Sequence, residues 1–385
     1  MTLQHQRRYA RRLLQQIGRR SLTRTEPISA GQLARETERY LMSHAVQSAV
    51  LYDIWYEQGN VPIAIERWSA RQQCRNTPAD YRRIRRRPVE WHPKARSTSG
   101  YRKICSFEVA VKMWHVMARE LICAQHRPRP HIGDWKGRGR HRQVRDLIAA
   151  IVSPEQAVVV ADIRHAFESV NAEAIYEIPY LPEQLIRGAI DHRTHRFVRR
   201  ERSHEQVNRV SPDAVDMSKM VPSGLMEGSP ASNAIFAVFL DDLPDQLDAT
   251  IQVFVYCDNI ILLAPNMSQA QRAHNSLAVY LSGHRAGPFL MSEEKVQSVT
   301  DEFQHLGYSL RLRDQVEVGL SLKNWDKLAN RAEGRCTEED IEGWLASSFP
   351  LIRGAPLEIA CENNGWASAT TLKEVISLNQ ASRSS

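Results

Sequence analysis

The sequence lacks the features that mark membrane proteins and disulfide-stabilised proteins. Its longest apolar stretches, residues 233–240 and 251–265, are shorter than the roughly 18 apolar residues of a membrane span, and Asp258 interrupts the second. The 6 cysteines are scattered without a C-x-x-C pair, which disfavours a zinc ribbon or a disulfide framework and predicts a reducing, cytoplasmic location. No internal repeat or low-complexity tract is present, which excludes repeat and fibrous architectures.

What is present is an ordinary globular composition with an uneven charge. The chain has 385 residues, 42% hydrophobic and 25% charged, which predicts two or three domains. The net charge is +7, but residues 1–150 carry 30 basic and 12 acidic residues (+18), whereas residues 151–385 carry 21 and 32 (−11). Arg-rich clusters in the first 150 residues favour a phosphate-rich partner such as nucleic acid. The alternatives are a solvated face and, for the acid-free N-terminus, a mitochondrial transit peptide.

Hydrophobic periodicity and turn residues predict a coarse order of elements. Residues 30–58 and 105–124 are expected to be helices, and the segments 59–103 and 125–143 loops with short strands. AVVVAD (157–162) predicts a buried strand, SGLMEGSP a loop leading into a helix near Ser229, and IQVFVYCDNIILLAP (251–265) a hairpin. A further helix is predicted to start at Thr337.

Two carboxylates follow apolar β runs. Asp162 stands at the end of one strand and Asp258 at a hairpin tip. If the strands are neighbours in one sheet, both carboxylates reach the same edge, where they could bind two hard divalent cations and support phosphoryl transfer. The alternative for either residue alone is a turn or capping role.

The motifs between residues 157 and 310 resemble those of reverse transcriptases, in the family's order. VVVADIRHAFESVN resembles the first palm motif, GLMEGSPASN the Gly-x-x-Gln-Gly-Ser-Pro segment, and FVYCDN the Tyr-x-Asp-Asp hairpin. SEEKVQ resembles the segment that carries a lysine near the triphosphate, and FQHLGYSL the hairpin called the primer grip. A single string of this kind is weak, but five in order indicate the family.

The resemblance implies a role for each matching residue. Asp162 and Asp258, with Ile163 beside them, would hold two Mg²⁺ ions, or Mn²⁺ instead, and Lys295 would be catalytic near the triphosphate. Phe167 would screen the sugar 2′ position, and Gly228 with Arg102 or Lys103, on a strand-like SGYRKICSF segment, would contact the nucleotide. The implied template and primer contacts are Glu227, Ser229, Pro230, Tyr256, Asn259, Leu306 and Gly307.

The resemblance also implies the architecture. The expected fold is α+β, a right-hand polymerase with an antiparallel palm sheet. Residues 1–150 would form a basic N-terminal extension and fingers, residues 151–310 the palm, and residues 311–385 a short helical thumb. The absence of an obvious ribonuclease H or maturase segment suits a compact bacterial enzyme.

Two residues depart from the family pattern within the chemistry itself. Asn259 stands where a second Asp is usual, and Glu227 where Gln is usual. These departures resemble the divergent, unknown-group reverse transcriptases of bacterial antiphage defence. Some members act beside a second reverse transcriptase and a non-coding RNA, and some polymerise without a conventional template. An extra anion at position 227 would repel a template phosphate.

Three functions follow from these observations. The first is an active DNA polymerase using deoxynucleotide triphosphates, with an RNA or atypical template. The second is a catalytically weakened nucleic-acid-binding scaffold for a partner polymerase. The third, an RNA polymerase or a nucleotidyl transferase on the same palm, is disfavoured by Phe167, unless that ring is ordinary core. Tyr256 could be a primer contact or a packing residue, and priming could use a nucleic-acid 3′ end or a tyrosine hydroxyl.

Overall fold

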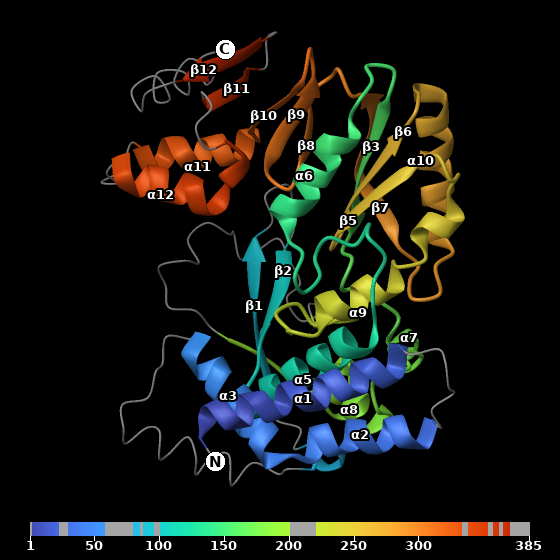
Figure 1. Cartoon of the computed structure of the whole chain (residues 1–385), viewed down its shortest axis with the longest axis vertical. Helices are drawn as coiled ribbons and strands as arrows, with labels where there is room; N and C mark the ends of the chain where they lie inside the picture. The colour runs from blue at the N-terminus through green and yellow to red at the C-terminus, as the bar shows by residue number, and fades with distance from the viewer. Residues whose placement is uncertain are drawn as a thin grey trace. The chain divides into compact units, whose positions relative to one another are not determined.

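The computed structural model describes nine stretches of the chain, which form two compact units (Figure 1). Unit 1 comprises residues 1–128, 165–240 and 283–289, and unit 2 comprises residues 129–164, 241–282 and 290–385. The predicted palm segment 151–310 is thus shared between both units, and its boundaries stay a prediction. The described residues are 2–22, 30–57, 80–84, 88–95, 101–200, 221–332, 338–352, 357–361 and 365–369.

Unit 1 combines helices with a three-stranded sheet of order β2-β1-β4. β1 pairs with β2 antiparallel and with β4 parallel. Its elements are α1 (Leu3–Leu22), α2 (Ala30–Met42), α3 (His44–Glu57), β1 (Val89–Ala95), β2 (Tyr101–Ser106), α5 (Val109–Gln125), α7 (Ala172–Tyr176), α8 (Glu183–Leu185), β4 (Phe197–Arg199) and α9 (Ser232–Phe239).

The predicted helices of unit 1 exist, but their bounds differ. The segment 30–58 forms two helices because Ser43 ends the first, and its main-chain carbonyl and hydroxyl accept hydrogen bonds from the start of the second. The helix predicted over 105–124 begins at Val109, since β2 extends to Ser106. Within α5, the apolar residues Trp114, Ala118 and Leu121 are buried.

Unit 2 contains a four-stranded antiparallel sheet of order β5-β6-β3-β7, a three-stranded sheet of order β10-β9-β8 and the hairpin β11-β12. Its elements are α6 (Arg140–Ala150), β3 (Ala157–Arg164), β5 (Gln252–Tyr256), β6 (Asn259–Ala264), α10 (Met267–Ser282), β7 (Leu290–Ser298), β8 (Phe303–His305), β9 (Tyr308–Leu312), β10 (Val316–Leu320), α11 (Leu322–Ala332), α12 (Glu338–Ser348), β11 (Leu357–Cys361) and β12 (Gly365–Ala369).

The strand predicted at residues 157–162 and the hairpin predicted at 251–265 are confirmed as β3, β5 and β6. β-Branched side chains favour this pleated, buried position. Helix α10 packs against β3, β6 and β7, as Figure 1 shows. A core that includes Val144 and Leu147 of α6, Val158 of β3 and Ile261 of β6 covers the other face. The central strands are therefore fixed from both sides, which gives residues at their ends defined positions.

The FQHLGYSL segment forms the predicted hairpin, with β8 paired to β9. Leu306 and Gly307 make its two-residue turn and both have positive φ, 50° and 87°, as a type I′ turn requires. The predicted thumb segment 311–385 contains α11 and α12 together with the strands β10, β11 and β12. Thr337, the predicted helix start, lies outside the described residues, and α12 begins at Glu338.

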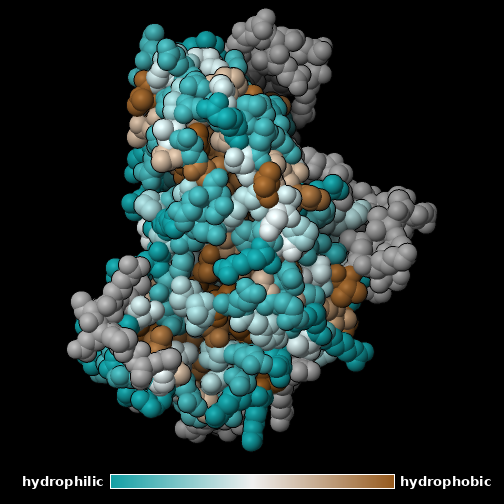
Figure 2. All heavy atoms as spheres, turned by 90° about the vertical axis from the view of Figure 1, so that its right-hand side faces the viewer, coloured by the Kyte–Doolittle hydropathy of each residue, from teal (hydrophilic) through white to brown (hydrophobic). Residues whose placement is uncertain are grey.

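The surface drawn in Figure 2 is predominantly hydrophilic and carries small, separate hydrophobic groups. The large hydrophobic side chains that are exposed are spread over several elements, for example Val198 on β4, Leu290 on β7 and Leu322 on α11. Within the described ranges, no helix combines the length and the apolar character that a membrane crossing needs.

Candidate active site

Unit 2 brings the two predicted carboxylates to one place. In the pairing of β3 with β6, Asp162 lies opposite Asn259, directly after the hairpin tip that carries Asp258. The main-chain N–H of Ile163 donates a 2.9 Å hydrogen bond to the carbonyl of Asp258. The expectation that both aspartates reach the same edge of one sheet is therefore confirmed.

The hairpin tip has a tight two-residue turn formed by Cys257 and Asp258. Tyr256 pairs with Asn259 across the turn, and Cys257 has a φ of 57°. Asn259 donates a 3.0 Å hydrogen bond from Nδ2 to Oδ1 of Asp258. A second aspartate at position 259 could not donate this bond in its ionised form. The Asn259 amide therefore orients the Asp258 carboxylate, whereas the aspartate that is usual in the family at this position would repel it.

Strand β7 adds a hydroxyl and a cation to the same sheet. The Ser292 hydroxyl lies 3.3 Å from Oδ1 of Asp162, and Ser292 is the β7 residue opposite Asp162. Lys295 lies opposite Val160, beyond a register shift between Val160 and Asp162, and its side chain is exposed. Residues directly opposite each other on neighbouring strands point to the same face, and Val160 and Asp162 are two residues apart on β3, so they share a face as well. Lys295 therefore belongs to the face that carries Asp162.

A third carboxylate, Asp134, lies beside this hairpin and was not found from the sequence. The segment before it runs alongside β5, where Gly133 N–H donates to Val255 O at 2.7 Å. Both Asp134 carboxylate oxygens are buried, and neither accepts a hydrogen bond of regular geometry. Burial, with a smaller contribution from the charge of Asp258, raises its pKa to about 6, although the Cys257 N–H opposes the rise. In the sequence Asp134 lies in a basic, Gly-rich loop, and nothing in that context predicts that it reaches the hairpin.

The oxygen donors at this edge suit a hard divalent cation. Mg²⁺ commonly takes only one or two protein carboxylates because substrate phosphates and water complete its shell. Asp162 and Asp258 can supply those two, and the buried oxygens of Asp134 add negative charge nearby. Among the described residues, no three His, Cys, Asp or Glu side chains form a ready-made metal cluster.

Unit 1 gathers the residues predicted to contact the nucleotide. The loop 221–231 is fixed on one side by Leu225 N–H, which donates to Phe167 O at 2.8 Å. On the other side, Cys105 N–H of the edge strand β2 donates to Glu227 O at 2.7 Å. Gly228 has a φ of 101°, and a Cβ there would lie 2.4 Å from Cys105 O. Only glycine fits this close approach of loop and strand.

The basic candidates of β2 both have acidic partners in this loop region. Arg102 forms an ion pair with Glu227. Lys103 Nζ lies 3.0 Å from Oε2 of Glu168 and donates to Val221 O at 3.1 Å. The structure thereby gives Glu227 a local function that the sequence did not suggest, because its charge is balanced by Arg102.

Ser229 and Phe167 are positioned by packing. The Ser229 hydroxyl is hydrogen bonded to Nδ1 of the buried His115 on α5, whose pKa burial lowers to about 3, so that the ring is neutral. The following residue, Pro230, is half-buried. Phe167 is half-buried and meets Phe236 of α9 edge-on, with ring centroids 5.6 Å apart. This contact fixes the Phe167 ring while leaving part of it accessible.

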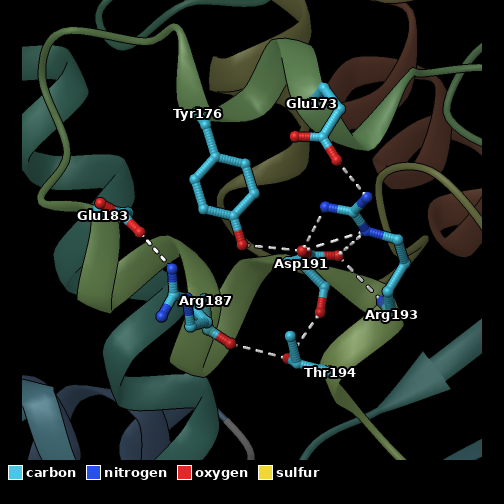
Figure 3. A pocket seen from close by; sticks show the side chains of 7 residues that line it. All are labelled: Glu173, Tyr176, Glu183, Arg187, Asp191, Arg193 and Thr194. Atoms are coloured by element: carbon cyan, nitrogen blue, oxygen red, sulfur yellow. Dashed lines mark hydrogen bonds and ion pairs between the residues drawn. The ribbon is translucent and has the colours of Figure 1, made fainter.

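A separate polar pocket in unit 1, drawn in Figure 3, has a volume of about 600 Å³. Its buried centre, Asp191, accepts hydrogen bonds from Arg193 and from Tyr176 at 2.8 Å. Burial opposes ionisation of Asp191, but these bonds hold its pKa below the ordinary value. Arg193 also pairs with Glu173, and Arg187 with Glu183. The charged side chains of this pocket therefore pair with one another. None of the residues in the predicted motifs lines the pocket.

An antiparallel sheet with two carboxylates at one edge is typical of a nucleotidyltransferase of the polymerase class. A family model described as "Reverse transcriptase (RNA-dependent DNA polymerase)" matches residues 93–310, which is more than half of the chain and includes every predicted site residue. The chain belongs to the reverse transcriptase family. The matched domain is that of an RNA-dependent DNA polymerase.

Other comparisons add little to this assignment. No curated protein matches the chain. Among solved structures, the chain is similar to one from the telomerase of Candida albicans in complex with a TWJ fragment of telomeric RNA, with 9% identity and a TM-score of 0.41. The match covers 71% of this chain and 54% of that one, so this chain spans about half of the telomerase chain. That likeness carries no argument about function.

Proposed function

We propose that this chain is an active DNA polymerase that adds deoxynucleotides to a 3′ hydroxyl by two-metal phosphoryl transfer. The observation that carries the proposal is the placement of Asp162 and Asp258 at one sheet edge, linked by the hydrogen bond from Ile163 N–H to Asp258 O. Two carboxylates at such an edge are what the cation-dependent chemistry requires.

The roles proposed for the protein's own groups follow from their positions. Asp162, Asp258 and the main chain of Ile163 would hold two Mg²⁺ ions, which when bound activate the attacking hydroxyl and neutralise the leaving pyrophosphate. Asn259 keeps the Asp258 carboxylate oriented through its amide. Lys295, exposed on the same face of the sheet, would stabilise charge on the pyrophosphate. Tyr256 and the turn Leu306–Gly307 would contact the primer.

An incorporation assay tests this proposal. The purified chain is incubated with each labelled deoxynucleotide and Mg²⁺, with and without RNA and DNA. Product that depends on an added template supports an ordinary reverse transcriptase, and product without any nucleic acid supports template-independent or protein-templated synthesis. If no labelled product forms under any of these conditions, the proposal of an active polymerase fails.

Phe167 is expected to exclude ribonucleotides. Its ring is oriented by Phe236 but only half-buried, so a sugar 2′ hydroxyl would meet it. We expect Phe167→Ala to reduce discrimination against ribonucleotides by about 10- to 100-fold, the range that one steric contact supplies. The measurement compares incorporation efficiency for matched ribo- and deoxynucleotides. Phe197→Ala, a half-buried aromatic of β4, is the control, and equal discrimination in both variants would make Phe167 a packing residue.

The outer face of α1 is expected to contribute to nucleic-acid binding. Arg8, Arg11 and Arg12 are exposed, and α1 contains no acidic residue. In contrast, Arg7 and Arg20 form ion pairs with Asp53 and Glu36. Changing the three exposed arginines to Gln should reduce the slope of log affinity against log salt by about 2, because each phosphate contact releases counterions.

The control for the α1 variant is Arg272→Gln, an exposed arginine on α10. An unchanged slope in the triple variant would identify the α1 face as merely solvated. A second basic cluster of the first 150 residues, residues 82–87, is tested in the same way. Arg82 is paired with Asp80 and Glu38, whereas residues 85–87 lie outside the described residues.

The proposed biological setting is bacterial antiphage defence. It rests on the resemblance of the departures at Asn259 and Glu227 to unknown-group reverse transcriptases. The closest candidate is the second reverse transcriptase of a type 3 defence-associated system, with another reverse transcriptase and a non-coding RNA as partners. Co-purification of both partners from a host carrying the neighbouring genes would test this, and loss of phage protection on deletion of this chain is the expected result.

A second candidate function is a catalytically weakened scaffold for a partner polymerase. The observation that favours it is the engagement of Arg102 and Lys103 by Glu227 and Glu168, which leaves the predicted nucleotide contacts balanced by acids. A chain that binds nucleic acid but never incorporates a deoxynucleotide, even with its partners present, would support this function.

A further inference from the structure

The charges around the predicted nucleotide contacts of unit 1 form two ion pairs that differ in accessibility. We call Arg102, Lys103, Glu168 and Glu227 the paired-charge cluster. It contains two cations and two anions, so it offers no net positive charge to a triphosphate. The cluster adjoins Phe167, because loop 221–231 is hydrogen bonded to the main chain of Phe167 and Glu168.

The Lys103–Glu168 pair is built as a fixed connection. The two side chains are only 14% and 19% exposed. Lys103 Nζ also donates to the main chain at Val221, so this lysine ties the start of loop 221–231 to the turn that carries Phe167. Removing Lys103 from these partners would leave a shielded carboxylate without its cation, which is costly.

The Arg102–Glu227 pair is different because its cation faces solvent. The Arg102 side chain is 48% exposed, whereas Glu227 is 14% exposed. Glu227 cannot follow Arg102 outward, since its main-chain carbonyl is held by Cys105 N–H and the next residue, Gly228, lies against the same strand. An anion from solvent can therefore approach Arg102 only in competition with a carboxylate that stays in place.

We propose that Glu227 is an intramolecular competitor for the triphosphate at Arg102, and that Lys103 is a positioning residue that never leaves Glu168. This inference rests on the proposed function and resolves which of the two basic residues of β2 meets the nucleotide. Arg102 exchanges the carboxylate of Glu227 for phosphate oxygens, which a guanidinium binds in the same fork geometry. The carboxylate left behind repels the phosphate, and this repulsion sets a weak affinity for deoxynucleotides.

The test measures binding without turnover. Calorimetric titrations in Ca²⁺ buffer use a deoxynucleoside triphosphate and, as a probe without sugar or base, inorganic tripolyphosphate. We expect Glu227→Gln and Glu227→Ala each to tighten binding of both probes about tenfold, because both remove the competing charge. We expect Arg102→Gln to weaken binding, and Glu227→Gln to give no gain in the Arg102→Gln background.

The matched control is Glu173→Gln, which removes another glutamate paired with an exposed arginine in unit 1. It should leave both affinities unchanged. Lys103→Gln tests the positioning role: it should lower the thermal midpoint, and Glu227→Gln should still tighten binding in the Lys103→Gln background. Thermal unfolding of each variant verifies folding.

The outcomes separate this inference from the proposed function. If the parent chain incorporates deoxynucleotides but Glu227→Gln binds both probes no more tightly, the competition is refuted while the polymerase stands. If Glu227→Gln binds the deoxynucleotide more tightly but tripolyphosphate no more tightly, the new amide itself contacts the nucleotide. That result also refutes the proposed competition. If neither the parent chain nor Glu227→Gln binds or incorporates any nucleotide, both proposals fail.

Discussion

Replacing Asp258 by Ala is expected to lower deoxynucleotide incorporation by about 1,000-fold or more. The carboxylate stands at the tip of the β5–β6 hairpin, next to Asn259, which lies opposite Asp162. A cation clamp on a transferring phosphoryl group supplies several kcal/mol to the transition state, and each 1.4 kcal/mol corresponds to about tenfold in rate. The measurement is the single-turnover rate of incorporation at saturating nucleotide.

Folding of the Asp258→Ala chain should be nearly unchanged. The hydrogen bond that joins the hairpin to β3 uses the main-chain carbonyl of Asp258, which the substitution retains. Asp314→Ala removes an exposed aspartate at the turn between β9 and β10 and serves as the control, with full activity expected. Incorporation by the Asp258→Ala chain at the parent rate would show that this hairpin is not the catalytic centre.

Gly228→Ala is expected to destabilise unit 1 by about 3 kcal/mol and to reduce incorporation by about 100-fold. The residue has a φ of 101°, and the added Cβ would lie 2.4 Å from Cys105 O, a main-chain atom that cannot rotate away. The loop must therefore move away from β2 and carry Glu227 and Ser229 with it. A displacement of about 1 Å at a positioning segment is sufficient for this loss of rate.

Thermal unfolding and the incorporation rate together check this prediction. Gly31→Ala is the control, because Gly31 lies in α2 of the same unit with no atom near its added Cβ. Alanine in a helix is favoured over glycine by about 1 kcal/mol, so this variant should be as stable as the parent or more so. Equal stability of the Gly228→Ala and parent chains would mean that the loop can shift without cost.

The positions of elements with strong local signals could be predicted well. The β-branched run of β3 and the two β-rich runs of the β5–β6 hairpin, which a polar Asp-Asn pair separates, are strong strand signals. The placement of Asp162 and Asp258 at one edge followed from adjacency of these strands, because a hairpin and its neighbour present their ends together. Helix bounds were less accurate: Ser43 splits one predicted helix, and the N-terminal residues of another belong to β2.

Contacts between distant segments could not be predicted. Asp134 reaches the hairpin because its segment runs alongside β5, and nothing in its neighbouring residues indicates that pairing. The acid at position 227 looked like a defect in a template contact, whereas Arg102 lies against it in the structure. Both cases involve residues more than 100 positions apart, and no local pattern encodes such pairings.

The sequence by itself determined the family, the order of the motifs, the separation of basic and acidic charge, and the choice of the two carboxylates that are predicted to be catalytic. These properties depend on residue type and spacing along the chain. Only the tertiary structure decided which side chains are partners: Lys103 and Arg102 form ion pairs with Glu168 and Glu227, and Asn259 is hydrogen bonded to Asp258. Electrostatic energy depends on distances in space and on burial, and folding sets both.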